Sequence, residues 1–179
     1  MMAQQTLDRL HELRLPGMAE ALEEQMRMSD MGSLDFEDRL ALLLERELTV
    51  RDDRRLTRLL RMAKLSLQAA VEDINFRSPR GLDRAVILRL ASGQWIHEHD
   101  NVLISGATGT GKSYLACALG HSACRHGLTT RYYRFSRLLD QLALARADGS
   151  YARLLDRLAK TQVLILDSCG DPGYVESEG

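Results

Sequence analysis

The sequence contains few aromatic residues and only three cysteines. The first scarcity limits the composition of the core, and the second bears on the redox state of the thiols. Aromatic residues make up 5% of the 179 residues, so a folded core must consist mostly of Leu, Ala, Ile and Val. Cys117, Cys124 and Cys169 are an odd number of thiols without the spacing of a metal or redox site. We therefore expect reduced cysteines, as in a cytosolic protein.

The sequence also lacks a long hydrophobic run and a strong excess of charge. No apolar stretch reaches the roughly 20 residues of a membrane-spanning helix. The first ten residues carry charges and none of the apolar character of a signal peptide. The 24 basic and 25 acidic residues give a net charge of −1, which argues against general coating of nucleic acid but allows local basic patches. These absences predict a cytoplasmic protein that does not bind membranes.

The N-terminal part of the chain is a predicted helical region. Hydrophobic residues recur at helical spacing before the Pro16-Gly17 pair, again after it, and along a long segment from residue 35 to residue 65. We predict an all-α module over residues 1–75, followed by a turn and a linker helix within residues 76–100.

Residues 101–167 alternate between short apolar runs and helical segments. The predicted strands cover residues 101–105, 129–135 and 163–167, and the predicted helices cover 112–126, 136–147 and 151–160. This alternation is typical of an α/β domain, in which helices flank a parallel sheet.

A glycine-rich segment between the first of these strands and the next helix has the spacing of a phosphate-binding loop, or P-loop. Its glycines permit backbone torsions that a Cβ would forbid, so that backbone N–H groups converge on phosphate oxygens. Its lysine would approach the β- and γ-phosphates, and its serine hydroxyl would bind Mg²⁺. The predicted nucleotide-binding residues are Gly106, Ala107, Thr108, Gly109, Thr110, Gly111, Lys112 and Ser113.

Asp167 is the second candidate metal ligand. It ends the last predicted strand, 55 positions after Lys112. P-loop proteins hold Mg²⁺ with a carboxylate at such a strand end, although an Asp there can also begin a turn. Downstream of a P-loop we favour the magnesium role.

Four arginines in the long predicted helix form a candidate DNA-binding stripe. Arg51, Arg54, Arg58 and Arg61 recur at spacings of three and four, so they share one helical face. Each contact of such a stripe with a DNA phosphate would steepen the salt dependence of binding. The alternative is a solvated face whose charges pair with nearby carboxylates.

Four segments of the sequence carry a resemblance to a known family. They are "LRLPGMAEALEEQ", "DFEDRLALLLERELTVRDDRRLTRLLRMAKL", "RGLDRAVILRLASGQWIHEHDNVLISGATGTGKSYLACALGHSAC" and "ARADGSYARLLDRLAKTQVLILD". In these segments the sequence resembles the IstB family, ATP-binding helper proteins of bacterial insertion-sequence transposition that are similar to DnaC-type helicase loaders among the AAA+ ATPases.

The resemblance implies a P-loop ATPase domain of the AAA+ type over residues 101–167, with ATP and Mg²⁺ as cofactors. It implies self-assembly on double-stranded DNA and stimulation or targeting of a transposase. It also implies that Lys112 and Ser113 contact nucleotide and Mg²⁺ and that Asp167 is the first Walker B acid.

The sequence departs from this family pattern after Asp167. The family has a second acid at the next position, where this chain has Ser168, and a neutral hydroxyl is a poor general base near pH 7. We expect residues 168–179 to be a tail outside the family pattern, so that the ATPase domain is incomplete at its C-terminus. In the family's sheet order, 5-1-4-3-2, the strand between those bearing Lys112 and Asp167 would then be missing. These differences predict impaired ATP hydrolysis.

Two other functions are compatible with parts of the sequence, and a third lacks its defining motif. A DnaC-like replicative helicase loader would share most of the same motifs. A non-catalytic remnant could still bind DNA or a transposase through its N-terminal helices. A GTPase would need an Asn-Lys-x-Asp motif, which the sequence does not contain.

Overall fold

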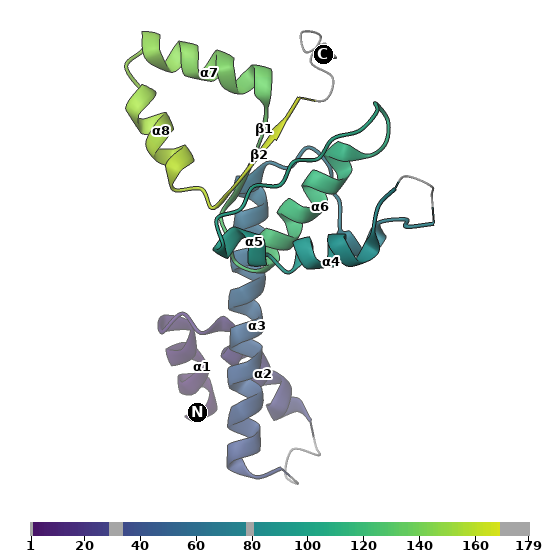
Figure 1. Ribbon diagram of the computed structural model, residues 1–179. Coiled ribbons are helices and arrows are strands. Elements are labelled where there is room, and N and C mark those ends of the chain that lie inside the picture. Colours follow the sequence, from purple (N-terminus) through teal and green to yellow (C-terminus); the bar gives the residue numbers. More distant parts are fainter. Residues whose placement is uncertain (1, 29–33, 78–80, 169–179) are drawn as a thin grey trace, which may run out of the picture. The chain divides into compact units, whose positions relative to one another are not determined.

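The computed structural model describes residues 2–28, 34–77 and 81–168, and these form two compact units. The first unit comprises residues 1–57 and the second residues 58–179. The chain is mostly helical, with one small parallel sheet in the second unit (Figure 1). Of the tail that the sequence analysis set apart, only Ser168 lies within the described residues.

The first unit consists of the three helices predicted for this region. They are α1 (Met2–Glu12), α2 (Pro16–Arg27) and α3 (Phe36–Ala63), the last of which continues into the second unit. Pro16 occupies the first turn of α2, where its missing N–H costs no hydrogen bond. Asp35 begins α3 by accepting a hydrogen bond from the backbone N–H of Asp38 at 2.9 Å.

Helices α2 and α3 are joined through Glu47, a buried carboxylate of α3. Its Oε2 accepts hydrogen bonds from the backbone N–H groups of Gly17 at 2.8 Å and Met18 at 3.2 Å, and therefore caps α2 from a neighbouring helix. Gly17 allows this approach, because a Cβ there would lie 2.7 Å from the Cα of Glu47. Arg51 donates to the other carboxylate oxygen of Glu47 at 2.7 Å.

The second unit adds a series of shorter elements to the end of α3. Asp83 caps α4 by accepting a hydrogen bond from the N–H of Ala85. Gly93 and Gly127 follow α4 and α6 in the left-handed conformation that glycine commonly adopts after a helix. In chain order the elements are the 3₁₀ turn η2 (Val71–Asp73), α4 (Arg84–Ala91), α5 (Gln94–His97), α6 (Lys112–Arg125), β1 (Thr130–Arg134), α7 (Phe135–Ala147), α8 (Tyr151–Ala159) and β2 (Val163–Asp167).

The sheet consists of β1 and β2 in parallel, with Thr130 opposite Val163 and Arg134 opposite Asp167. Helix α6 packs closely against it at Gly120, where a Cβ would lie 2.6 Å from Cδ1 of Ile165. The core around α6 buries Cys117 and Cys124 almost completely, so both are packing residues of this core. Cys169 lies outside the described residues.

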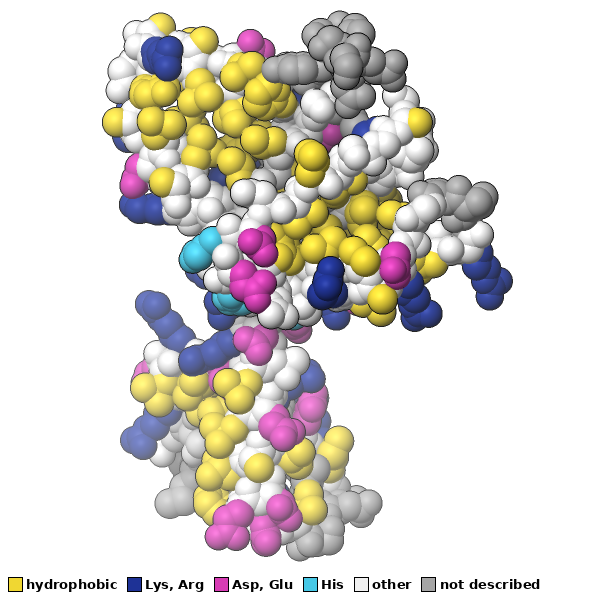
Figure 2. Space-filling view, in the orientation of Figure 1, with side chains coloured by type: hydrophobic (Ala, Val, Ile, Leu, Met, Phe, Trp, Pro, Cys, Tyr) yellow, Lys and Arg dark blue, Asp and Glu magenta, His cyan; other side chains and the backbone are white. Residues whose placement is uncertain are grey.

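The structure corrects the prediction of a strand at residues 101–105. This segment carries no strand hydrogen bonds, and the side chain of Leu103 is 92% exposed. A strand requires backbone pairing with a neighbour, and within the described residues β2 pairs only with β1. Figure 2 shows hydrophobic side chains gathered on the face that carries β2, α7 and α8, where Leu164 and Leu166 are exposed as well.

The two units divide inside α3, between Thr57 and Arg58. The helical module predicted from the sequence extends further, to residue 75. The segment that follows α3 packs on the P-loop helix instead. Ala69 and Val71 are buried in one cluster with Leu115 of α6. Because an apolar run at helical spacing does not reveal which surface it covers, periodicity alone could not locate this division.

Candidate functional site

The P-loop lies directly before α6, as the sequence predicted, and its glycines adopt conformations that other residues rarely do. Gly106, Gly109 and Gly111 have φ values of 148°, 82° and 94°. Gly111 is the residue before the first turn of α6. The loop thereby directs the N-terminal end of a 14-residue helix toward the space where phosphates would bind.

The lysine of the loop is held by the loop's own backbone. Lys112 Nζ donates hydrogen bonds to the carbonyl oxygens of Gly106 at 2.6 Å and Ala107 at 2.9 Å. Thr110 also donates from its hydroxyl to the Ala107 carbonyl, at 2.8 Å. These contacts keep the ammonium over the loop, so a phosphate bound there would meet a charge that is already in position.

Asp167 is a buried carboxylate at the carboxyl end of β2. Its Oδ2 accepts a hydrogen bond of 2.7 Å from the hydroxyl of Tyr132 on β1. Burial and this hydrogen bond raise the pKa of Tyr132 to about 12, so its hydroxyl remains a proton donor at neutral pH. Sequence reasoning missed Tyr132, because only the pairing of β1 with β2 brings the two residues together.

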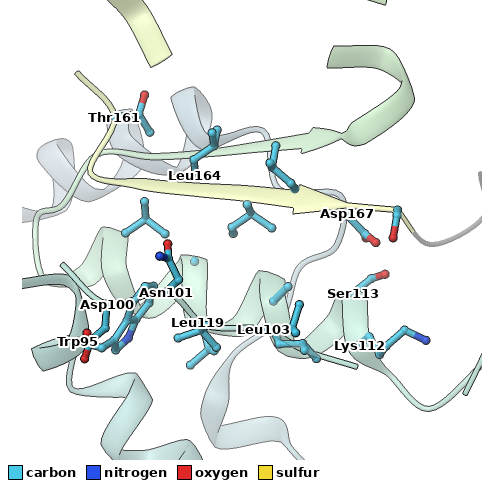
Figure 3. A pocket seen from close by; sticks show the side chains of 18 of the residues that line it. Trp95, Asp100, Asn101, Leu103, Lys112, Ser113, Leu119, Thr161, Leu164 and Asp167 are labelled. Carbon is cyan, nitrogen blue, oxygen red and sulfur yellow. The ribbon is translucent and has the colours of Figure 1, made fainter. Parts of the chain in front are cut away.

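A cavity of about 420 Å³ brings three predicted site residues together (Figure 3). Lys112 and Ser113 line it from the start of α6, and Asp167 lines it from the end of β2. Serine hydroxyl and carboxylate oxygens are the kind of ligands that Mg²⁺ binds. The donor atoms present therefore fit a magnesium ion shared between α6 and β2.

A second cavity, of about 500 Å³, is lined by more of the P-loop than the first. Gly106, Ala107 and Thr110 of the loop line it, together with the apolar side chains of Ile74 and Leu82. The walls of this cavity come from separate segments whose contact depends on the fold, so local sequence patterns do not reveal it.

The predicted arginine stripe lies on α3. Arg51 is paired with Glu47 within the first unit. Arg54, Arg58 and Arg61 are exposed. Arg51 is thus held in an ion pair within α3, and DNA binding by the stripe stays a prediction. Among the described residues, no helix is long and apolar enough to cross a membrane.

Comparisons with known proteins identify the relatives of this chain. A model of the family described as IstB-like ATP binding protein matches residues 8–178, so the match includes most of the segment expected to lie outside the family pattern. A protein of insertion sequence IS1162 from Pseudomonas fluorescens, named for ATP binding, is 54% identical over 95% of this chain and 74% of its own length.

More distant relatives carry names of the same kind. The Sinorhizobium fredii protein y4pL, also named for ATP binding in an insertion sequence, is 51% identical over 95% of this chain and 69% of its own length. The corresponding protein of insertion sequence IS21 from Pseudomonas aeruginosa is 29% identical over 90% of this chain and 61% of its own length. The glycine conformations and lysine contacts of the P-loop agree with membership in the matched family. The family match and these relatives show that this chain belongs to the IstB-like family of ATP-binding proteins of insertion sequences.

Proposed function

We propose that this chain binds ATP with Mg²⁺ at the P-loop and serves as a cytoplasmic helper of DNA transposition. The observation that carries the proposal is the cavity that Lys112, Ser113 and Asp167 line together. Family membership supports ATP as the nucleotide, since the relatives are named for ATP binding. A P-loop NTPase domain of the AAA+ type is the fold that this membership favours.

The phosphate groups would be bound by the loop and the first turn of α6. Lys112 would exchange its two carbonyl acceptors, on Gly106 and Ala107, for phosphate oxygens. Ser113 and Asp167 would hold the magnesium ion, which neutralises phosphate charge when bound. Tyr132 would keep the Asp167 carboxylate oriented through its hydrogen bond.

The adenine ring would occupy the second cavity. The apolar side chains of Ile74 and Leu82 offer a surface for a flat base, and Asn75 lines the same cavity with an amide that can hydrogen-bond. Because P-loop residues line both cavities, one nucleotide bound at the loop would place its base in the second cavity and its magnesium-bound phosphates in the first.

Hydrolysis by residues 1–179 would be slow. Ser168 directly follows Asp167, is exposed and lines the phosphate cavity. Its neutral hydroxyl cannot take a proton from an attacking water near pH 7, and a general base typically contributes about 10²- to 10⁴-fold to a rate. Binding of ATP without rapid turnover is therefore the activity that these residues favour.

Transposition is the setting that the comparisons favour over helicase loading. The relatives described above are all named as proteins of insertion sequences. We infer that the chain acts with double-stranded DNA and a transposase and that it assembles with further copies of itself. Pull-down with a transposase and with a replicative helicase would distinguish the two settings, and capture of the helicase alone would contradict this inference.

The nucleotide proposal is tested by replacing the loop lysine. Lys112→Ala should weaken binding of a fluorescent ATP analogue by about 10- to 100-fold, since a charge-assisted hydrogen bond contributes roughly 1.5–3 kcal/mol. Lys160→Ala is the matched control, because Lys160 is exposed, pairs with Asp156 on α8 and lines neither cavity. Equal affinity of the Lys112 variant and the parent chain would overturn the assignment.

A further inference from the structure

The outer edge of β1 carries a cleft that shares only Tyr132 with the proposed nucleotide site. The opposite edge of β1 pairs with β2, and within the described residues this sheet has no third strand. The cleft has a volume of about 300 Å³ and lies within the second unit. Its walls come from the end of α3, from β1, from the first turns of α7 and from α8, and the lining residues are Met62, Ala63, Lys64, Arg131, Tyr132, Tyr133, Arg134, Arg137, Gln141 and Arg157.

We call these lining residues the basic cleft, because they include five cations and no carboxylate. The cations are Lys64, Arg131, Arg134, Arg137 and Arg157. The whole chain, by contrast, has a net charge of −1. None of the five forms an ion pair with an Asp or Glu among the described residues. Within the part of the chain that the structure describes, this surface therefore concentrates positive charge that no carboxylate pairs with.

Protection of a sheet edge does not explain the arrangement. Charged side chains on an edge strand discourage pairing with another strand, and Arg131 and Arg134 on β1 would be sufficient for that. Lys64, Arg137 and Arg157 instead reach the same cleft from three helical segments. The left-handed backbone of Lys64, with φ of 52°, places the first of these cations at the end of α3. Convergence of like charges from separate elements is unfavourable unless an anion offsets it.

The number and type of these groups match an extended polyanion. A single small anion is saturated by two or three cations, whereas five along one cleft suit successive phosphates. Arginine, lysine, glutamine and tyrosine are the side chains that commonly contact the phosphates and sugars of DNA. Single-strand binders also present exposed aromatic rings for base stacking, but Tyr132 and Tyr133 are half-buried and the Tyr132 hydroxyl is bound to Asp167.

We propose that the basic cleft binds the phosphate backbone of duplex DNA. This deepens the proposed function, on which its setting in transposition rests, by assigning the DNA contact to a surface of the second unit. The surface differs from the arginine stripe predicted on α3, since the two sets of residues share no member. Binding through the backbone predicts little sequence preference and a strong dependence on salt.

The test is binding of a fluorescently labelled duplex of about 20 base pairs to the full chain, followed by anisotropy over a series of salt concentrations. Arg137→Gln with Arg157→Gln removes two cations from two helices. It spares Arg134, which lies opposite Asp167 in the sheet. The double variant should bind about tenfold or more weakly at 0.1 M salt, and the slope of log affinity against log salt should fall by about 1.8, or roughly 0.9 for each contact.

A second double variant controls for the loss of net charge. Arg89→Gln with Arg153→Gln removes two exposed arginines that do not line the cleft, and its salt slope should equal that of the parent. An unchanged slope in the Arg137 and Arg157 variant would overturn the proposal. Equal competition by a single strand would refute the duplex assignment, and equal competition by polyglutamate would assign the cleft to an acidic protein. ATP affinity measured on the same samples separates this result from failure of the nucleotide proposal.

Discussion

Replacement of Glu47 by Gln should destabilise the first unit and leave the second unit nearly unchanged. The substitution keeps the size of the side chain and removes its charge. Glu47 is 5% exposed, and its carboxylate accepts hydrogen bonds from the N–H groups of Gly17 and Met18 at the positive end of α2. The loss of charge therefore acts on two bonds that hold α2 to α3.

The size of the effect follows from the strength of these bonds. A hydrogen bond to a charged group contributes roughly 1.5–3 kcal/mol and a neutral one about 0.5–1.5 kcal/mol. Two such changes predict a loss of about 2 kcal/mol in the free energy of unfolding of the first unit. The pair with Arg51 adds little, because that arginine side chain is 57% exposed and its charge is screened by solvent.

Urea unfolding with two probes tests this prediction. Helical circular dichroism reports on both units, whereas fluorescence of Trp95, the chain's single tryptophan, reports on the second. In Glu47→Gln the dichroism should begin to fall at lower urea while the fluorescence midpoint stays in place. Glu45→Gln, an exposed neighbour on α3, should change the stability by less than about 0.5 kcal/mol. Coincident curves for the parent and the Glu47 variant would refute the reasoning.

The same contact predicts a dependence on pH. Burial alone would raise the pKa of Glu47, but the hydrogen bonds from Arg51, Met18 and Gly17 outweigh burial and lower it. A carboxyl whose pKa is lowered on folding adds stability above its unfolded pKa, and this stability is lost as the pH falls through the folded pKa. The parent should thus lose more stability than Glu47→Gln on acidification below about pH 5.

Two further predictions concern the core of the second unit. Gly120→Val should lower the free energy of unfolding by about 1–3 kcal/mol, because even a Cβ at this position would lie 2.6 Å from Ile165 Cδ1. Trp95 fluorescence in urea measures this change. Unchanged stability would mean that α6 and the sheet are less closely packed. The thiols of Cys117 and Cys124 should react with a thiol reagent only after unfolding, since both are buried and burial raises the pKa of Cys124. Rapid labelling of either cysteine in the folded chain would contradict this packing.

Local sequence signals predicted most of the elements and the P-loop. The turn chemistry of Pro16, Gly93 and Gly127 marks helix ends through the conformation of single residues, and the structure places helix boundaries beside all three. The spacing of the P-loop likewise depends on neighbours in the chain. Such signals are readable because both the residue and its effect lie within one turn of backbone.

Features that depend on distant contacts could not be predicted in this way. An apolar run at residues 101–105 has the composition of a strand, but strand formation depends on a paired neighbour that the sequence does not display. The bond between Tyr132 and Asp167 follows from the register of β1 with β2. The basic cleft depends on three helical segments that converge on one strand.

The most direct test of the account is the magnesium dependence of ATP affinity, measured by calorimetric titration of the parent chain, Ser113→Ala and Asp167→Asn. The account holds that one ion is shared by the start of α6 and the end of β2, whose side chains line the same cavity. Added Mg²⁺ should tighten ATP binding to the parent by about tenfold or more, and each substitution should remove most of this gain. If Mg²⁺ tightens binding equally in all three chains, Ser113 and Asp167 do not form a metal site.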